Sequence, residues 1–222
     1  MRMSELSERS GVAVATIKFY LREGLLAAGE RTSPNQAAYD DGHVDRLRLV
    51  RALIDVGGLS VAATSAVIAA IDTPEVPLNH AFEIAQNALP GVLPEGEEGP
   101  AGPGASAVQG ELADRGWFVT RGNPGHPVAA RVLDTYERLG LTNLHAVLPA
   151  YLDAAELIAR ADLDAVAAAS DRAQMVETVV VGTVLGDSLL AGLRRIAQER
   201  ESHLRFGTPP GPDKNCEPGE TP

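Results

Sequence analysis

Apolar residues at three- and four-residue spacings indicate two short helices at the beginning of the chain, within residues 3–26. Gly11 separates the two patterns and can supply a sharp turn, while Ser4 can cap the first helix. The second helix is predicted from about residue 13 to residue 23. Positions at these spacings share one face of a helix. A common buried stripe is therefore expected for Val14, Ile17, Leu21 and Leu25, which Leu6 of the first helix can meet.

The other faces of the second helix carry hydroxyl, aromatic and cationic side chains. A short helix of this kind suits the major groove of DNA, which is lined with phosphates. Thr16 and Phe19 lie away from the stripe, with Tyr20 on one side and two cations on the other. Together with two residues of the segment that follows, the predicted DNA contacts are Val14, Ala15, Thr16, Lys18, Phe19, Tyr20, Arg22, Arg31 and Tyr39.

A polar segment after the second helix predicts a β-hairpin. Residues 29–38 read GERTSPNQAA, and the turn formers Pro34 and Asn35 stand in the middle. Such a hairpin can act as a wing beside the helix pair, with Arg31 on the phosphate backbone.

Two further helices are predicted after the hairpin. Asp40 or Asp41 can cap a helix over residues 44–56, which Gly57 and Gly58 would end. Ser60 can then cap a helix that runs to residue 71.

The ordered string of motifs resembles the N-terminal domain of the MerR family of transcriptional regulators. It consists of GV at 11–12, TIKFY at 16–20, REGLL at 22–26, RT at 31–32 and YD at 39–40, continuing through Val44, Leu47, Leu53, Gly57 and Leu59-Ser60. The resemblance covers about the first third of the chain. It implies a winged helix-turn-helix domain, a second helix pair, and a homodimer on an operator with two-fold symmetry. The alternative from the residues alone is an amphipathic helical domain with an ordinary solvated face.

The chain departs from the family pattern at several positions. Lys18 stands where an arginine is common, Phe19 where a tyrosine is, and Leu21 where a glutamate is usual. A lysine lacks the bidentate fork of an arginine, so looser contacts are expected through Lys18. The operator sequence therefore cannot be carried over from the family.

Prolines interrupt the pattern after residue 72. Pro74 and Pro77 break the long helix through which many family members dimerise. Residues 73–106 are predicted as a connecting helix (77–89) and a Pro/Gly-rich linker (90–104). Residues 107–206 predict a bundle of four helices, at 108–115, 127–139, 144–161 and 170–203, followed by a disordered tail at 207–222. The predicted fold is mainly α, with a winged helix-turn-helix domain at residues 1–72, a short β-hairpin wing and a C-terminal α-helical bundle.

The last helix of the bundle is a candidate dimer interface. Gly182 and Gly186 are four residues apart on one face, and each costs ~1 kcal/mol relative to alanine inside a helix. Close approach of a second helix at a two-fold axis would explain them; a glycine-tolerant core helix is the alternative.

Four aromatic residues are candidates for an effector site. They could line an apolar cavity for a small organic molecule, although aromatic residues of a small bundle also commonly form its core. Parts of residues 116–198 are similar to the C-terminal regions of some actinobacterial MerR-type regulators, which in turn resemble the ligand-binding and dimerising bundle of the TetR family. The four residues are Trp117, Phe118, Tyr136 and Tyr151.

Charge and composition agree with an intracellular regulator. The net charge is −11, but residues 1–72 hold 8 Lys+Arg against 9 Asp+Glu, so most of the acidity lies further along the chain. A near-neutral domain is expected to bind DNA tightly only in two copies. The longest apolar stretch, residues 179–193, contains Asp187 and is short for a membrane span. A cytoplasmic location is therefore predicted.

The sequence predicts neither an enzyme nor a cofactor. Cys216 is the single cysteine, the five histidines lack a second ligand at metal spacing, and no phosphate-binding loop or nucleophile motif occurs. The predicted partners are an operator in double-stranded DNA, a second copy of the chain, a small organic effector, and RNA polymerase as a further candidate. Two alternatives stay open: a protein that mainly sequesters a small molecule, and an effector-independent dimeric DNA-binding protein.

Overall fold

The computed structural model describes residues 1–33, 36–73, 75–91, 102–120 and 122–207 of the chain. Its contacts divide the chain into two compact units, Met1–Gly186 and Asp187–Pro222. Several predictions fall outside the described residues: the turn at Pro34 and Asn35, the break at Pro74, most of the Pro/Gly-rich linker, and the tail with Cys216.

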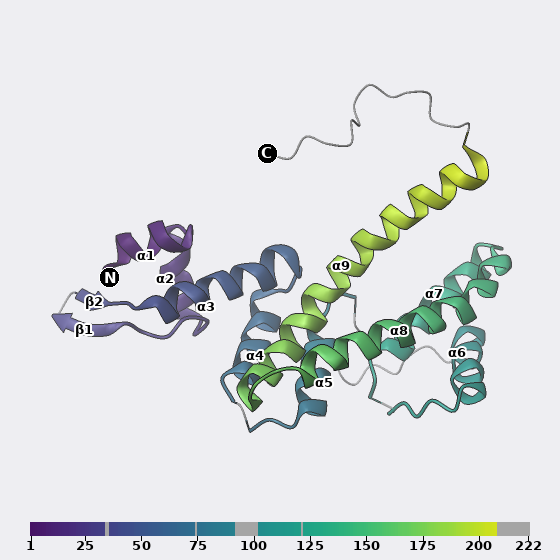
Figure 1. The fold of residues 1–222 in the computed structure, drawn as a ribbon, viewed down its shortest axis with the longest axis horizontal. Helices are drawn as coiled ribbons and strands as arrows, with labels where there is room; N and C mark the ends of the chain where they lie inside the picture. Colours follow the sequence, from purple (N-terminus) through teal and green to yellow (C-terminus); the bar gives the residue numbers. More distant parts are fainter. Residues whose placement is uncertain (34–35, 74, 92–101, 121, 208–222) are drawn as a thin grey trace. The chain divides into compact units, whose positions relative to one another are not determined.

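The first unit begins with the predicted helix pair (Figure 1). α1 (Met3–Ser10) ends at Gly11, whose φ of 69° lies in the left-handed region that glycine adopts without strain. α2 (Val14–Arg22) follows after a short turn. The predicted Ser4 cap is wrong, because α1 already begins at Met3 and the N-cap residue, Arg2, makes no side-chain capping bond.

A two-stranded antiparallel hairpin follows α2, as the polar segment predicts. β1 (Glu30–Ser33) pairs with β2 (Gln36–Ala38), and Arg31 lies opposite Ala37. The register shifts between Arg31 and Ser33, which places an irregularity next to the tip.

α3 (Asp41–Arg51) begins at a capping box between Asp40 and His43, and it continues without a break into a π-helical segment (Ala52–Val56). α4 (Val61–Ile71) is capped by Ser60, whose hydroxyl accepts a hydrogen bond from the Ala63 amide at 3.1 Å. The Asp40 and Ser60 caps and the end of the helix before Gly57 agree with the prediction, whereas α3 begins at Asp41, earlier than the predicted residue 44.

The remaining helices are α5 (Leu78–Ala88), α6 (Pro103–Asp114), α7 (Gly125–Arg138), a 3-10 segment (Thr142–Val147), α8 (Leu148–Ala167) and α9 (Arg172–Phe206). α6 begins inside the predicted linker. Pro103 suits the first turn of a helix, and the Gly104 amide donates to the Asp134 carboxylate of α7 at 2.7 Å. The described part of the second unit is the end of α9 and Gly207.

The largest core joins the N-terminal elements to the first half of α9. Val180 and Val184 of α9 are fully buried in this core. A Cβ atom on Gly57 would lie 2.4 Å from Val184 Cγ1 and 2.7 Å from the Leu53 carbonyl oxygen, so a glycine permits this approach. The predicted bundle of residues 107–206 is therefore not packed apart from the N-terminal region. The largest side chains of the core are those of Leu6, Ile17, Leu25, Leu47 and Leu53.

Two smaller cores hold the other helices together. α5, α8 and α9 meet around Ala81, Val166, Val176 and Val179. α6 and α7 pack through Val108, Leu112 and Leu133, with Trp117, Tyr136 and Leu152 at the edge. The structure confirms the predicted fold class: mainly α, with one small hairpin in the described residues.

α9 is long and apolar enough to cross a membrane by length and composition. One such helix is weak evidence, because core helices of soluble proteins pass the same test; 22% of the apolar window of α9 is buried, including residues among Val176, Val179, Val180 and Val184.

Candidate nucleic-acid interface

α2 presents a mixed cationic and aromatic surface on its exposed side. Ala15, Lys18 and Arg22 are exposed, whereas Val14, Thr16 and Phe19 are half-buried. The Arg22 guanidinium lies 5.2 Å from the centre of the Phe19 ring, and its Nε lies 3.4 Å from a Glu23 carboxylate oxygen. The Phe19 ring thus supports Arg22 by a cation–π contact.

The prediction that Tyr20 lies on the exposed side of α2 is wrong. Tyr20 is only 5% exposed, since it follows Ile17 by three residues and shares the buried stripe. Burial raises the pKa of the Tyr20 hydroxyl; Arg51 lowers it and Asp55 raises it further, both by smaller amounts. Tyr20 therefore supports the helix from the core side.

The hairpin is anchored at its base by Tyr39. The Tyr39 amide donates to the Met1 carbonyl at 2.9 Å, and the Tyr39 ring packs edge-on against His43 at 5.2 Å between centres. A Cβ atom on Gly29 would lie 2.5 Å from the Ala38 carbonyl oxygen, so the two strands can close only around a glycine there. Arg31 is exposed on β1.

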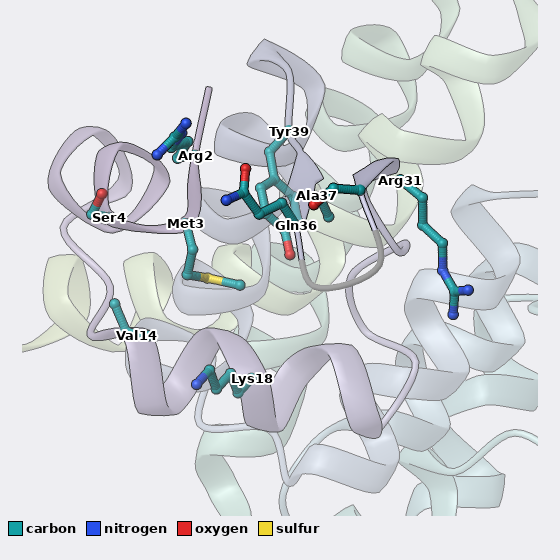
Figure 2. A pocket seen from close by; sticks show the side chains of 10 residues that line it. Arg2, Met3, Ser4, Val14, Lys18, Arg31, Gln36, Ala37 and Tyr39 are labelled. Atoms are coloured by element: carbon teal, nitrogen blue, oxygen red, sulfur yellow. The ribbon is translucent and has the colours of Figure 1, made fainter.

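A cleft of about 740 Å³ opens between the start of α1, α2 and the hairpin (Figure 2). Three cations line it, each from a different element: Arg2 before α1, Lys18 on α2 and Arg31 on β1. Among the described residues that line the cleft there is no carboxylate, so all the charged side chains of the lining are cationic. The other lining residues are Met3, Ser4, Val14, Ser33, Gln36, Ala37 and Tyr39.

The cleft unites four of the nine predicted DNA-contacting residues: Val14, Lys18, Arg31 and Tyr39. The other five lie elsewhere on α2. The sequence reasoning missed Arg2 as a member of the site, because only the pairing of Met1 with Tyr39 brings it to the hairpin. The position of a cationic residue immediately before the first helix was the feature of the sequence that could have indicated Arg2.

The comparisons with known proteins identify this N-terminal region. The family profile of the MerR HTH family regulatory protein matches residues 1–71. The chain is also similar along almost its whole length to the crystal structure of SCO5550, a proposed transcriptional regulator of Streptomyces coelicolor A3(2). The identity is 35% and the TM-score 0.63, over 95% of this chain and 100% of the other. Residues 1–71 of this chain are a helix-turn-helix domain of the MerR family.

Two curated relatives are similar to a part of this chain. The nodulation protein NolA of Bradyrhizobium elkanii is 45% identical over 56 residues, 25% of this chain and 26% of that protein. The mercuric resistance operon regulatory protein of Bacillus cereus is 36% identical over 56 residues, 25% of this chain and 42% of that protein. The chain thus matches about a quarter of the length of NolA and less than half of the length of the mercuric resistance regulator.

The four predicted effector-site aromatics of this MerR-family chain do not converge on one cavity. Phe118 is 93% exposed and Tyr151 is exposed on α8, whereas Trp117 and Tyr136 pack at the edge of the α6–α7 core. The prediction of one shared cavity is wrong, because Phe118 and Tyr151 are exposed while Trp117 and Tyr136 pack against the α6–α7 core. Trp117 and Tyr136 remain candidates for an effector contact.

The candidate dimer glycines lie on an open part of α9. A Cβ atom on either Gly182 or Gly186 would meet no described atom within 4 Å. No neighbouring helix among the described residues therefore accounts for a glycine at either position. Among the described residues, no group of three or more His, Cys, Asp or Glu side chains could hold a metal ion.

Proposed function

We propose that this MerR-family regulator binds a two-fold-symmetric DNA operator as a homodimer, in the cytoplasm, and that its C-terminal helices respond to a small organic effector. The cleft between α1, α2 and the hairpin carries the proposal, because its cations come from three elements and no carboxylate of the described residues lines it. DNA is a regular polyanion, and cationic side chains account for most of its affinity for proteins.

In this proposal α2 enters the major groove. Thr16, Lys18 and Arg22 reach the bases or the nearest phosphates, and Ala15 and Val14 lie at the entry of the helix. Phe19 supports Arg22 through the ring contact at 5.2 Å. The hairpin lies against the flanking backbone, where Arg31 contacts phosphates irrespective of sequence.

α9 supplies the dimer contact in this proposal. Its first half is fixed to the DNA-binding core by Val180 and Val184, while Gly182 and Gly186 point to open space. In the sequence, alternating four- and three-residue steps lead from Gly182 and Gly186 to Leu189, Leu193 and Ile196, all three exposed. Such a spacing is that of a helix seam in a coiled coil. A second copy of α9 is the proposed occupant of this face.

The effector part of the proposal is supported by the apolar surface of the C-terminal helices. Phe118 and Leu157 are well exposed, and Trp117 and Tyr136 are half-buried at the edge of the α6–α7 core. A small apolar molecule or RNA polymerase could use such a surface. Ligand binding with no preference for any DNA sequence would favour a sequestering protein, and operator binding that no small molecule changes would favour an effector-independent regulator.

DNA titrations of the full chain test the proposal. A duplex selected from a random pool by the protein itself serves as the operator, with a scrambled duplex as control. Lys18→Ala should weaken operator binding by ~1–3 kcal/mol if Lys18 reads a base, or lower the salt slope by about one per bound copy if it meets a phosphate. Arg31→Ala should weaken binding to both duplexes alike.

Arg48→Ala is the matched control, because Arg48 is exposed on α3, pairs with Asp45 and does not line the cleft. Failure of the protein to prefer any duplex would overturn the proposed function. Unchanged affinity and slope for both Lys18→Ala and Arg31→Ala would remove α2 and the hairpin from the interface.

A further inference from the structure

We infer that Arg2, the N-cap residue of α1, is a third contact to the DNA backbone and closes the end of the cleft opposite the hairpin arginine. The inference rests on the proposed DNA binding and adds a residue outside both α2 and the hairpin.

The ion pairs of the N-terminal region distinguish Arg2 and two other cationic residues from the rest. Residues 1–72 hold eight cationic side chains, and five of these form ion pairs with carboxylates. The other three, Arg2, Lys18 and Arg31, make no side-chain hydrogen bond or ion pair with any described residue, and all three line the same cleft. The five pairs are Arg9–Asp41, Arg22–Glu23, Arg46–Asp72, Arg48–Asp45 and Arg51–Asp55.

The backbone holds Arg2 at a fixed place between the hairpin and α1. On one side, the Tyr39 amide donates to the Met1 carbonyl at 2.9 Å. On the other side, the Leu6 amide donates to the Arg2 carbonyl at 2.9 Å, in the first turn of α1. Figure 2 shows Arg2 beside the start of α1, Lys18 on α2 and Arg31 on the hairpin, with the guanidinium groups of Arg2 and Arg31 directed outward on opposite sides.

Arg2, Lys18 and Arg31 place three positive charges around one cleft, and the summed field of such charges attracts an anion. Because every other Lys or Arg side chain of residues 1–72 has a carboxylate partner, this arrangement favours a polyanion as the occupant. A guanidinium can donate two parallel hydrogen bonds to a phosphodiester, and Ser4, Ser33 and Gln36 supply further polar groups in the lining. The DNA backbone next to the groove that receives α2 has this chemistry.

The salt dependence of DNA binding by the full chain tests the inference. Arg2→Ala should lower affinity for the selected and the scrambled duplex alike, and the salt slope should fall by about one per bound copy. The ratio of wild-type to variant affinity should then decrease roughly 3.5-fold per bound copy between about 50 and 200 mM salt. Arg48→Ala, which removes the same charge outside the cleft, should leave the slope unchanged.

Arg2→Lys separates a specific fork from a point charge, because it should keep the salt slope and lose part of the affinity. Thermal unfolding of each variant checks that the fold is intact; Arg2 is exposed, so little change is expected. If the wild-type protein binds DNA and Arg2→Ala has the wild-type slope, the inference is overturned and the proposed function stands. If Arg48→Ala lowers the salt slope as much as Arg2→Ala does, the effect comes from the net charge of the protein, and the inference is overturned. If the wild-type protein shows no salt-dependent DNA binding, both fail together.

Discussion

The N-terminal helices and α8 both carry an amphipathic pattern, but the chain buries only the former. In residues 1–71 the apolar stripes of α1 to α4 meet in one core, and Leu6, Ile17 and Leu47 are fully buried. Of the 20 residues of α8, all of them described, Val166 alone is buried. Tyr151, Leu157 and Leu163 of α8 are exposed.

This difference separates two sources of stability. Burial of a leucine side chain contributes roughly 1.5–3 kcal/mol, so the DNA-binding region gains its stability within one chain. The apolar side chains of α8 gain little from the fold of a single chain. Their contribution depends on what meets that surface, such as a second copy or an effector.

The largest expected effect on stability compares the N-terminal core with the exposed surface of α8. Leu47→Ala should lower the free energy of unfolding by ~2–5 kcal/mol, because Leu47 is 0% exposed and its loss leaves a cavity. Leu163→Ala on α8, where the side chain is 53% exposed, should change it by less than about 0.5 kcal/mol. Urea denaturation of both variants measures the contrast. Equal losses would show that α8 is buried in the native assembly and would break the comparison.

The close approach of α9 to Gly57 allows a test of whether α9 belongs to the N-terminal core. Gly57→Ala should destabilise the protein by ~1–3 kcal/mol, since the new Cβ would lie 2.4 Å from Val184 Cγ1. Gly110→Ala in α6 is the control: a Cβ there meets no described atom within 4 Å, so helix propensity should stabilise the protein by up to about 1 kcal/mol. Chemical denaturation of the two variants measures the change in the free energy of unfolding. A neutral Gly57→Ala would mean that α9 does not depend on this close approach.

The open face of α9 allows a test of association apart from folding. Gly186→Leu should weaken the proposed dimer by ~1–3 kcal/mol through overpacking and shift the protein toward monomer. Gly110→Leu places the same side chain on α6 and should leave the oligomeric state unchanged. Sedimentation velocity over a range of protein concentrations measures both. An unchanged dimer in Gly186→Leu would exclude this face of α9 from the interface.

The smallest effect concerns the pH dependence of the cap of α3. The hydrogen bonds from the His43 side chain and backbone hold the pKa of the Asp40 carboxyl below its ordinary value of 3.8. Since the folded-state pKa is the lower one, ionised Asp40 adds stability above pH 3.8, and this is lost as the pH falls through the folded-state pKa. Thermal melts should show a small wild-type advantage over Asp40→Asn near neutral pH that shrinks below pH 3.8. A difference that grows on acidification would contradict this sign.

Helical spacing and caps in the sequence were enough to predict most of the elements. Residues 13–23 were expected to form a helix and α2 spans Val14–Arg22; residues 77–89 were expected and α5 spans Leu78–Ala88. The predicted Ser60 cap forms. These features depend on neighbours within a few residues, which is why local pattern determines them. The same local motifs were enough for the MerR resemblance, which the family profile over residues 1–71 confirms.

The sequence predicted less well where a side chain depends on distant parts of the chain. Tyr20 was expected on the exposed side of α2, but it shares the buried stripe of Ile17 and is 5% exposed in the core that α2 joins. The four aromatics of residues 117–151 were expected to share a cavity, yet Phe118 is exposed while Trp117 packs against the α6–α7 core. The periodicity of a sequence predicts on which face of its helix a side chain lies. It does not predict which other helix covers that face.

The amino-acid sequence by itself thus determined the helices, the hairpin and the regulator family, because each follows from short-range spacing, turn chemistry and motif order. Only the tertiary structure decided that α9 completes the N-terminal core through Val184 at Gly57, and that Arg2 joins Lys18 and Arg31 in one cleft. Both require segments far apart in the chain to meet: residue 57 with residue 184, and residue 1 with residue 39. Such contacts are fixed by packing of whole elements, for which a local pattern carries no information.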